Sequence, residues 1–133
     1  MQAGLSQTSR TFVVCDEDSP KRVIGYYSIA SSSLATTEAL DRIKAGSGSH
    51  PIPAVILARL AVDKEWQGQG IGSALVFDAV KRVARLQNEL GIRALLVQAI
   101  DENAKSFYEK LGFRTAKFNP RLLMALLKDI KTN

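Results

Sequence analysis

One glycine-rich segment, Gln67 to Gly72 with the sequence QGQGIG, constrains this chain of 133 residues more than any other feature. It follows an apolar, strand-like run at 54–62 and precedes a run of helical periodicity at 73–90. Glycines let the backbone turn tightly, and a helix N-terminus offers free N–H groups and a partial positive charge. The order of strand, glycine loop and helix therefore predicts a turn that binds the phosphates of a cofactor.

Three known types of phosphate-binding loop compete for this segment. A mononucleotide P-loop needs a lysine after its last glycine, but Gly72 is followed by Ser73. A dinucleotide-binding loop of the pattern Gly-x-Gly-x-x-Gly fits at Gly68 and Gly70, but Ser73 occupies its third glycine position. The pattern Gln-x-x-Gly-x-Gly matches in full at Gln67, Gly70 and Gly72. The third type is therefore favoured.

A second pattern follows in the last third of the chain. After a strand-like run at 94–99, the segment Asn103 to Phe113 reads Asn-Ala-x-x-Phe-Tyr-x-x-x-Gly-Phe. In this order and at this spacing, the two patterns resemble the two signatures of the GNAT acyltransferases. The resemblance implies an α/β (α+β) fold, with a mixed, mostly antiparallel central sheet flanked by helices. It also implies acetyl-CoA as the cofactor.

Three further segments narrow the resemblance. The stretches 9–15 (SRTFVVC), 25–30 (GYYSIA) and 51–63 are similar to one GNAT branch, the toxins of bacterial toxin–antitoxin pairs that acetylate aminoacyl-tRNA. Members of this branch carry an additional N-terminal helix and strand, which this chain is expected to lack. The resemblance implies a type II toxin that transfers acetyl to the amino group of aminoacyl-tRNA and blocks translation. It also implies a ribbon-helix-helix antitoxin as partner, and a homodimer stays open.

Two other functions remain open on the sequence. A GNAT enzyme of this kind can instead acetylate a small amine or a protein N-terminus, which offer the same nucleophile. Alternatively, a shortened chain can be a non-catalytic form that binds only the cofactor or the antitoxin. The presence of Tyr108, Gly70 and Gly72 argues for an active enzyme.

The bulk composition is that of a globular protein, and we expect a single domain over residues 1–133. The net charge of +5 fits a polyanionic partner such as tRNA, although coenzyme A is also an anion. No apolar run approaches the roughly 20 residues of a membrane span, and no signal peptide is evident. Cys15 is the single cysteine and is expected to be a buried, inert thiol. A reducing cytoplasm is therefore the expected location.

Hydrophobic periodicity and turn residues predict the elements of the fold. A helix at 34–45 is expected to turn Leu40 and Ile43 inward, and Asp101 is expected to cap the helix that follows it. The other expected elements are strands at 10–16 and 23–30 joined by a polar turn at 16–22, a strand at 54–62, a helix at 73–90, a strand at 94–99, a helix at 102–111 and a last strand at 122–127.

Tyr108 is the expected catalytic residue. Its phenol has a reference pKa of about 10, so it stays protonated at neutral pH and can give a proton to a departing thiolate. In the GNAT family the matching tyrosine has this role. The alternative is that Tyr108 only packs with Phe107 and Phe113 in the core. An esterified α-amino group is a weak base and needs no strong catalytic base, so the sole histidine, His50, is expected to be a solvated loop residue.

The resemblance also implies how the cofactor is held. The strand before the glycine loop is expected to splay from its neighbour, so that its exposed backbone pairs with the pantetheine arm and one N–H polarises the thioester carbonyl. Asn103 is expected to hydrogen-bond this arm or, alternatively, to cap its helix. The predicted cofactor-binding residues are Leu60, Ala61, Val62, Gln67, Gly68, Gln69, Gly70, Ile71, Gly72, Ser73, Asn103 and Phe107, although Phe107 also suits a structural role on another face of its helix.

Basic residues supply the predicted tRNA contacts. A charge at Arg59, on a central strand, must be paired or face a cleft. Two basic groups, one on the helix at 73–90 and one after the Gly-Phe pair, fit either solvated faces or phosphate contacts. The predicted substrate-binding residues are Arg59, Lys81, Arg82, Arg85, Arg114 and Lys117, with Arg121 as a further member of the last cluster. No metal site is expected.

Overall fold

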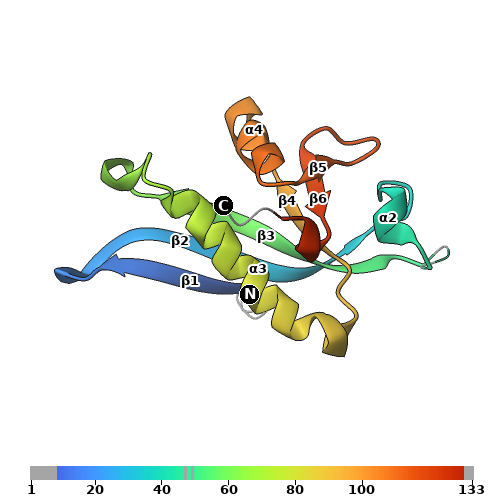
Figure 1. The fold of residues 1–133 in the computed structure, drawn as a ribbon, viewed down its shortest axis with the longest axis horizontal. Coiled ribbons are helices and arrows are strands. Elements are labelled where there is room, and N and C mark those ends of the chain that lie inside the picture. The colour runs from blue at the N-terminus through green and yellow to red at the C-terminus, as the bar shows by residue number, and fades with distance from the viewer. Residues whose placement is uncertain (1–8, 47, 49, 131–133) are drawn as a thin grey trace, which may run out of the picture.

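The computed structural model describes residues 9–46, 48 and 50–130, which build a six-stranded sheet (Figure 1). The strand order is β1-β2-β3-β4-β6-β5; β3 and β4 are parallel and the other neighbours are antiparallel. This is the mixed, mostly antiparallel sheet that we expected. The elements are β1 (Ser9–Asp16), β2 (Ser19–Leu34), α2 (Asp41–Lys44), β3 (Ile52–Val62), η1 (Lys64–Trp66), α3 (Ile71–Leu90), β4 (Ala94–Gln98), α4 (Glu102–Lys110), β5 (Arg114–Thr115), β6 (Leu122–Ala125) and η2 (Leu127–Asp129).

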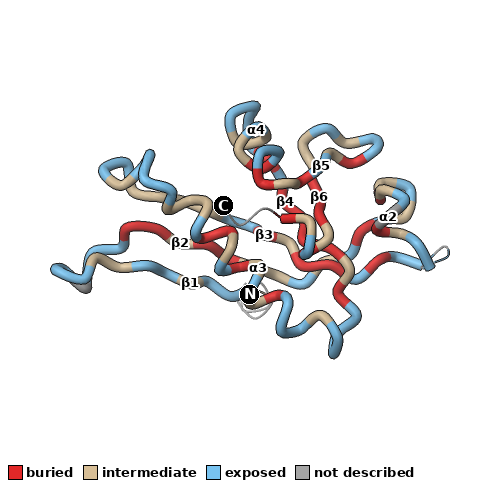
Figure 2. Tube along the Cα trace, viewed as in Figure 1, coloured by how far each residue is buried: buried red, intermediate tan, exposed pale blue. Residues whose placement is uncertain are grey.

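Two apolar cores lie on opposite faces of the sheet. The larger core packs α3 and α4 against one face, and Leu57, Val83 and Leu95 are among its buried members. The smaller core lies under the segment that contains α2, where Ile43 and Met124 are buried. Burial is strongest along β4 and weak along β1, which forms one edge of the sheet (Figure 2). The centre of the sheet is therefore a rigid platform for the segments at its ends.

The region between 16 and 45 differs from the sequence-based expectation. The hairpin turn predicted at 16–22 is present but shorter than expected, since only Glu17 and Asp18 form it and the Asp18 N–H donates to the Asp16 carboxylate (3.0 Å). The strand predicted at 23–30 extends to Leu34, and the helix predicted at 34–45 shrinks to the four residues of α2. The strand is longer because of long-range pairing, since the serine-rich end of β2 continues its ladder along β3. Residues 35–40 of the predicted helix form turns instead.

Most helix ends agree with the sequence. α3 ends at Gly91, whose φ of 67° is left-handed, and the Asp101 carboxylate accepts the Ala104 N–H (2.8 Å) at the start of α4. Ile43 is buried as expected. Cys15 is not: it is partly exposed, because β1 has a neighbour on one side only. Among the described residues, no helix is long and apolar enough to cross a membrane.

A polar cluster anchors α3 to the edge of the sheet. The buried Tyr27 donates its hydroxyl proton to Asp78 Oδ2 (2.5 Å) and accepts from Arg82 Nε (2.7 Å). The Arg82 guanidinium also lies 3.8 Å from the centre of the Phe12 ring. Burial, followed by the bond to Asp78, raises the pKa of the Tyr27 phenol to about 12. This cluster fixes the middle of α3 over β1 and β2.

The cluster predicts a loss of stability at alkaline pH. In the unfolded chain the phenol of Tyr27 titrates near pH 10, whereas in the folded protein its pKa is about 12. Between these values the unfolded state has released a proton that the folded state keeps, so the free energy of unfolding falls as pH rises. In urea unfolding at pH 9 and pH 11, Tyr27→Phe should cost about 1 kcal/mol at pH 9 and show a smaller alkaline loss than the wild type. An equal loss in both proteins would contradict this.

Candidate active site

The site begins where β3 and β4 part. The two strands pair from Ala54 opposite Ala94 only as far as Leu57 opposite Val97, while β3 continues to Val62 along β2. Within the described residues, the β4 side of β3 therefore carries no strand beyond this point. The expected splay is present, and it leaves backbone N–H and C=O groups of β3 available to a bound molecule.

A β-bulge in β3 marks the start of this splay. Ser28 of β2 is opposite Arg59, but the next residue, Ile29, is opposite Leu57, so Ala58 is the extra residue. Because a bulge shifts the alternation of side chains along a strand, it re-aims every side chain after it. Leu57 and Leu60 consequently pack on the same core, although they are three residues apart. The sequence pattern did not predict this bulge.

A hollow of about 720 Å³ lies between the end of β3, the start of α3 and α4. Every residue of the predicted cofactor set except Gln69 lines it, and so does Tyr108. Residues that the sequence analysis did not place here are Trp66, Ile100, Asp101 and Ala104. Segments far apart in sequence thus form one elongated cleft, and the two patterns read from the sequence supply most of its wall.

The glycine loop has the geometry of an anion-binding turn. Gly68 and Gly70 have φ angles of 83° and 84°, which favour glycine, and a Cβ on either would meet no atom within 4 Å. Gly70 is the N-cap of α3 and has no side chain to cap it, so the first N–H groups of this 20-residue helix remain available among the described residues. The Gln67 side chain donates to the Val62 carbonyl (2.9 Å) and so ties the loop to β3.

At two other glycines, the absence of a side chain matters because neighbouring atoms pack closely there. A Cβ on Gly72 would lie 3.4 Å from Cζ of Phe107, so the Phe107 ring packs closely against the start of α3. A Cβ on Gly25 would lie 3.1 Å from the Ala61 carbonyl oxygen and 3.2 Å from Cδ1 of Leu75. Gly25 thus lets β3 and the first turns of α3 pack closely over β2. Because its role depends on contacts distant in sequence, no local pattern indicated it.

Tyr108 lies on α4 and is only 7% exposed. Its ring packs edge-on against Phe107 and Phe113, with centroid separations of 5.0 Å and 5.6 Å. Burial raises the pKa of its phenol to about 12. The structure is compatible both with a packing role for Tyr108, because its ring belongs to the core, and with a catalytic role, because the residue also lines the cleft.

A second, smaller hollow of about 270 Å³ meets the cleft at Tyr108. The two share Leu60, Ile100, Ala104 and Tyr108 in their walls. Arg59 is the only charged side chain among the described residues that line the smaller hollow, and it forms no ion pair with any other described residue. Of the two alternatives for Arg59, the structure favours a charge that faces a cleft.

The basic residues predicted on α3 lie outside both hollows. Arg82 is held by Tyr27 and by Asp78, whose Oδ2 lies 3.2 Å from Arg82 Nε. Lys81 and Arg85 are exposed on the helix surface. Arg82 thus has a structural role in this cluster, while the other two remain free to meet solvent or phosphates.

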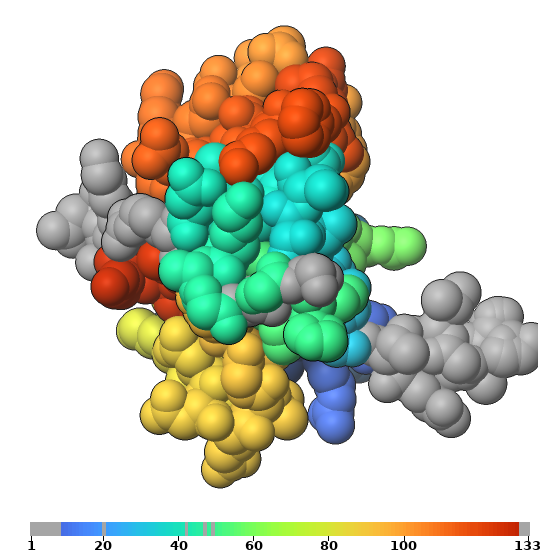
Figure 3. All heavy atoms as spheres, turned by 90° about the vertical axis from the view of Figure 1, so that its right-hand side faces the viewer, coloured from blue at the N-terminus to red at the C-terminus, as the bar shows by residue number. Residues whose placement is uncertain are grey.

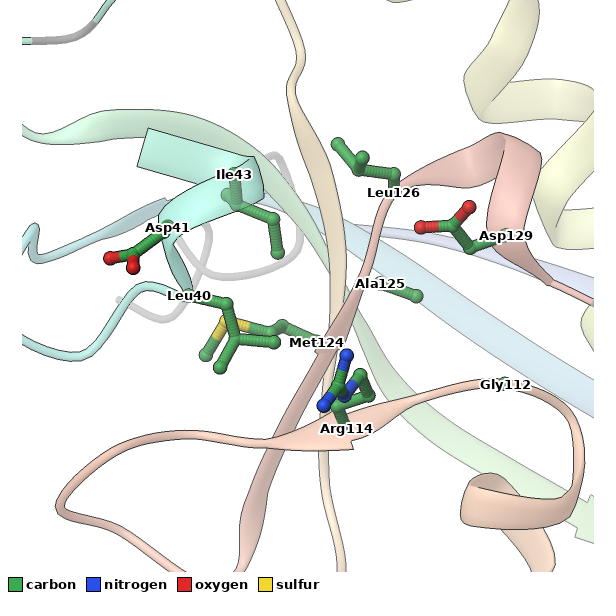
Figure 4. Close-up of a pocket in the computed structure, with 9 residues that line it drawn as sticks. All are labelled: Leu40, Asp41, Ile43, Gly112, Arg114, Met124, Ala125, Leu126 and Asp129. Atoms are coloured by element: carbon green, nitrogen blue, oxygen red, sulfur yellow. The ribbon is translucent and has the colours of Figure 1, made fainter. Parts of the chain in front are cut away.

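The second predicted basic cluster lies near α2. Lys117 pairs with Asp41 (3.4 Å), the first residue of α2, which lies on the right of Figure 1. Arg114 lines a separate hollow of about 240 Å³, where it lies close to Met124 of the neighbouring strand (Figure 4). Of the six predicted substrate contacts, only Arg59 therefore lines a hollow that also contains Tyr108. The described residues hold no cluster of His, Cys, Asp and Glu that suits a metal ion.

The model of the family described as "Acetyltransferase (GNAT) domain" matches residues 8–115. The chain belongs to the GNAT acetyltransferases. It is 39% identical over 123 residues to the tRNA-acetylating toxin of Mycobacterium tuberculosis, a match that covers 92% of this chain and 72% of the relative. The predicted GNAT fold, the acetyl-CoA-dependent enzyme class and membership of the tRNA-acetylating toxins are thereby confirmed.

Solved structures agree with this family. The complex of AtaT with acetyl-methionyl-tRNAfMet superposes with a TM-score of 0.84 at 29% identity, over 96% of this GNAT chain and 76% of that chain. A tyrosine-to-phenylalanine mutant of AtaT, bound to the C-terminus of the antitoxin AtaR and to acetyl-CoA, gives a TM-score of 0.76 at 31% identity, over 96% and 72% of the two chains. Relatives with this fold therefore bind acetyl-CoA, a charged tRNA and an antitoxin.

Proposed function

We propose that this GNAT chain transfers the acetyl group of acetyl-CoA to the amino group of aminoacyl-tRNA, and that it acts as the toxin of a toxin–antitoxin pair. One observation carries the proposal: the cleft that contains the glycine loop meets a small hollow whose described lining includes one cation, Arg59, and Tyr108 lines both. The identity to a tRNA-acetylating toxin supports the same reaction.

The cleft fits acetyl-CoA by the chemistry of its walls. The free N–H groups at the start of α3 suit the pyrophosphate, and the glycines leave room for its close approach. The unpaired side of β3 beyond Leu57 suits the amides of the pantetheine arm. Asn103 and Phe107 line the same cleft from α4. When bound, acetyl-CoA supplies an acetyl thioester that is activated toward amines.

Tyr108 would hold the proton that the departing sulfur needs. In the transfer a C–N bond forms to the acetyl carbon while its C–S bond breaks, so the sulfur gains a proton and the amine loses one. Burial raises the pKa of this phenol to about 12, above the roughly 8.5 of an ordinary thiol, so the transfer of its proton to the sulfur is uphill. The same loss of solvation also raises the pKa of a thiol in the filled cleft. The difference between the pKa of the phenol and that of the thiol therefore becomes smaller.

Arg59 would act on the acceptor side. An α-amino group has a pKa of about 7.7–8.0, and a neighbouring cation favours its neutral, nucleophilic form. The guanidinium can also pair with a phosphate at the end of the tRNA. The hollow of about 270 Å³ has room for a small acceptor group but not for a nucleic acid, so the body of the tRNA would lie outside it.

The proposed reaction also assigns roles to the exposed basic residues and to a protein partner. Exposed Lys81 and Arg85, together with Arg114 and Lys117, would supply sequence-independent contacts to tRNA phosphates. Charged tRNA is found in the cytoplasm, where we place the activity. A ribbon-helix-helix antitoxin would neutralise the toxin; the binding of the antitoxin AtaR to AtaT supports an antitoxin partner.

Transfer of radiolabelled acetyl tests this function. The purified chain is incubated with labelled acetyl-CoA and charged bulk tRNA, with tRNA that was deacylated beforehand as the matched control. The proposal predicts label in the charged tRNA and none in the deacylated tRNA. Label that appears instead on protein N-termini or on added small amines would assign a different acceptor to the same enzyme.

A further inference from the structure

Phe118 is the one aromatic residue among the strongly exposed large apolar side chains of the described chain. Its side chain is 78% exposed, on the loop 116–121 that joins β5 to β6. A single exposed apolar side chain needs no explanation by itself. Here, however, three features suggest a binding role: the hydrogen bonds that hold the loop, its connection to the acceptor hollow and the cations beside the ring.

The loop holds this ring outward by hydrogen bonds on both sides. The Phe118 N–H donates to Glu38 Oε1 (2.8 Å), and the Lys117 N–H donates to the Glu38 carbonyl (3.3 Å). Further along, the Arg121 N–H donates to Asn119 Oδ1 (3.1 Å). Figure 3 shows this region stacked directly on the teal segment that contains Glu38. The ring is thus presented to solvent by a fixed backbone rather than by a loose one.

The same loop borders the acceptor hollow. The Arg121 carbonyl accepts the Ala99 N–H (2.8 Å), and the Arg121 side chain pairs with Glu102 (3.4 Å). Ala99 is the residue between Gln98 and Ile100, both of which line that hollow. Ile100 is itself 86% exposed. The loop that carries Phe118 is therefore tied by its last residue to the segment 98–100, which forms part of the wall of the hollow.

Two cations flank the ring in sequence, Lys117 and Arg121. Their ion pairs with Asp41 and Glu102 are exposed, and exposed pairs are weak, so a phosphate can replace the carboxylates at little cost. An aromatic platform beside cations is the combination that binds unpaired nucleic acid, since bases stack on the ring while the cations meet the backbone. A tRNA carries its aminoacyl group at the end of such an unpaired strand.

We propose that Phe118 is a stacking platform for an unpaired base near the 3′ end of aminoacyl-tRNA. The inference rests on the proposed function, because it takes the hollow at Tyr108 as the place of the acceptor amine. Lys117 and Arg121 would contact the neighbouring phosphates. The stack would hold the 3′ strand in line with the hollow while the duplex stays outside.

Steady-state kinetics with charged tRNA test the role of the ring. Phe118→Ala should raise KM for charged tRNA at least about five-fold, with kcat and KM for acetyl-CoA unchanged, and Phe118→Trp should restore the wild-type KM. The matched control is Leu90→Ala, which truncates another exposed apolar side chain at the far end of α3. An unchanged KM in Phe118→Ala, or an equal rise in Leu90→Ala, would overturn the proposal.

A binding experiment separates this proposal from the proposed reaction. Deacylated tRNA with 2-aminopurine in its unpaired 3′ end should lose fluorescence when it binds the wild type or Phe118→Trp, and lose much less with Phe118→Ala. This readout needs no acetyl transfer, so failure of the labelling assay alone would identify failure of the reaction. If Phe118→Ala instead changes only antitoxin binding or the mass of the oligomer, the ring is a protein contact and the proposal is wrong.

Discussion

Replacing Tyr108 with phenylalanine should lower kcat for acetyl transfer by about 10²- to 10³-fold and leave KM for acetyl-CoA nearly unchanged. The substitution removes the hydroxyl that would protonate the leaving sulfur, but it keeps the ring. The edge-on contacts with Phe107 and Phe113 are therefore kept, and the cleft retains its shape. The expected loss is one of chemistry, which initial rates at saturating acetyl-CoA and charged tRNA measure directly.

Tyr27→Phe is the matched control for this loss. It removes a buried phenol hydroxyl that also has a raised pKa, but Tyr27 lines neither the cleft nor the acceptor hollow. Its kcat should stay close to that of the wild type, although its stability falls. If Tyr108→Phe retained a third or more of the wild-type kcat, another group would have to supply the proton, and Tyr108 would be a packing residue.

Gly112→Ala should destabilise the fold by on the order of 3 kcal/mol. A Cβ at this position would lie 2.4 Å from the backbone carbonyl oxygen of Asp129, and the φ of 111° is one that only glycine adopts readily. Two mobile side chains can move apart, but here the obstacle is the backbone of the C-terminal turn η2. That turn packs against the end of α4, so the helix that carries Tyr108 must shift or the turn must detach.

Gly91→Ala is the control that measures the cost of the backbone conformation without a steric clash. Gly91 also has a left-handed φ, of 67°, but a Cβ there would meet no atom within 4 Å. Its substitution should therefore cost only about 1 kcal/mol, the cost of the backbone conformation alone. Urea unfolding of the two variants compares the costs. Equal destabilisation would mean that the contact between Gly112 and η2 contributes little to the fold.

Local patterns predicted the parts of the site that depend on neighbours in sequence. The glycine loop, the cap at Asp101 and the helix end at Gly91 need only the conformations of a few adjacent residues, and each lies where the pattern placed it. The position of Tyr108 followed from its resemblance to a family signature, and the structure puts it in the wall of the same cleft as the loop.

Features that depend on contacts across the fold could not be predicted from the sequence. The extension of β2 from residue 30 to Leu34 depends on its pairing with β3, which no local propensity reports. The bulge at Ala58 and the space required at Gly25 are defined by partner strands. Arg82 appeared as part of a basic stripe, and only the packing of α3 over Tyr27 shows that its charge is already engaged.

The chemical identity of the product is the most direct test of the proposed reaction. After incubation with acetyl-CoA and charged tRNA, nuclease digestion releases the 3′-terminal nucleoside with its amino acid, and mass spectrometry locates the acetyl group. The proposal predicts N-acetyl-aminoacyl-adenosine with the wild type and strongly reduced product with Tyr108→Phe. An acetyl group on an internal nucleotide, or unmodified aminoacyl-adenosine beside acetylated protein, would contradict it.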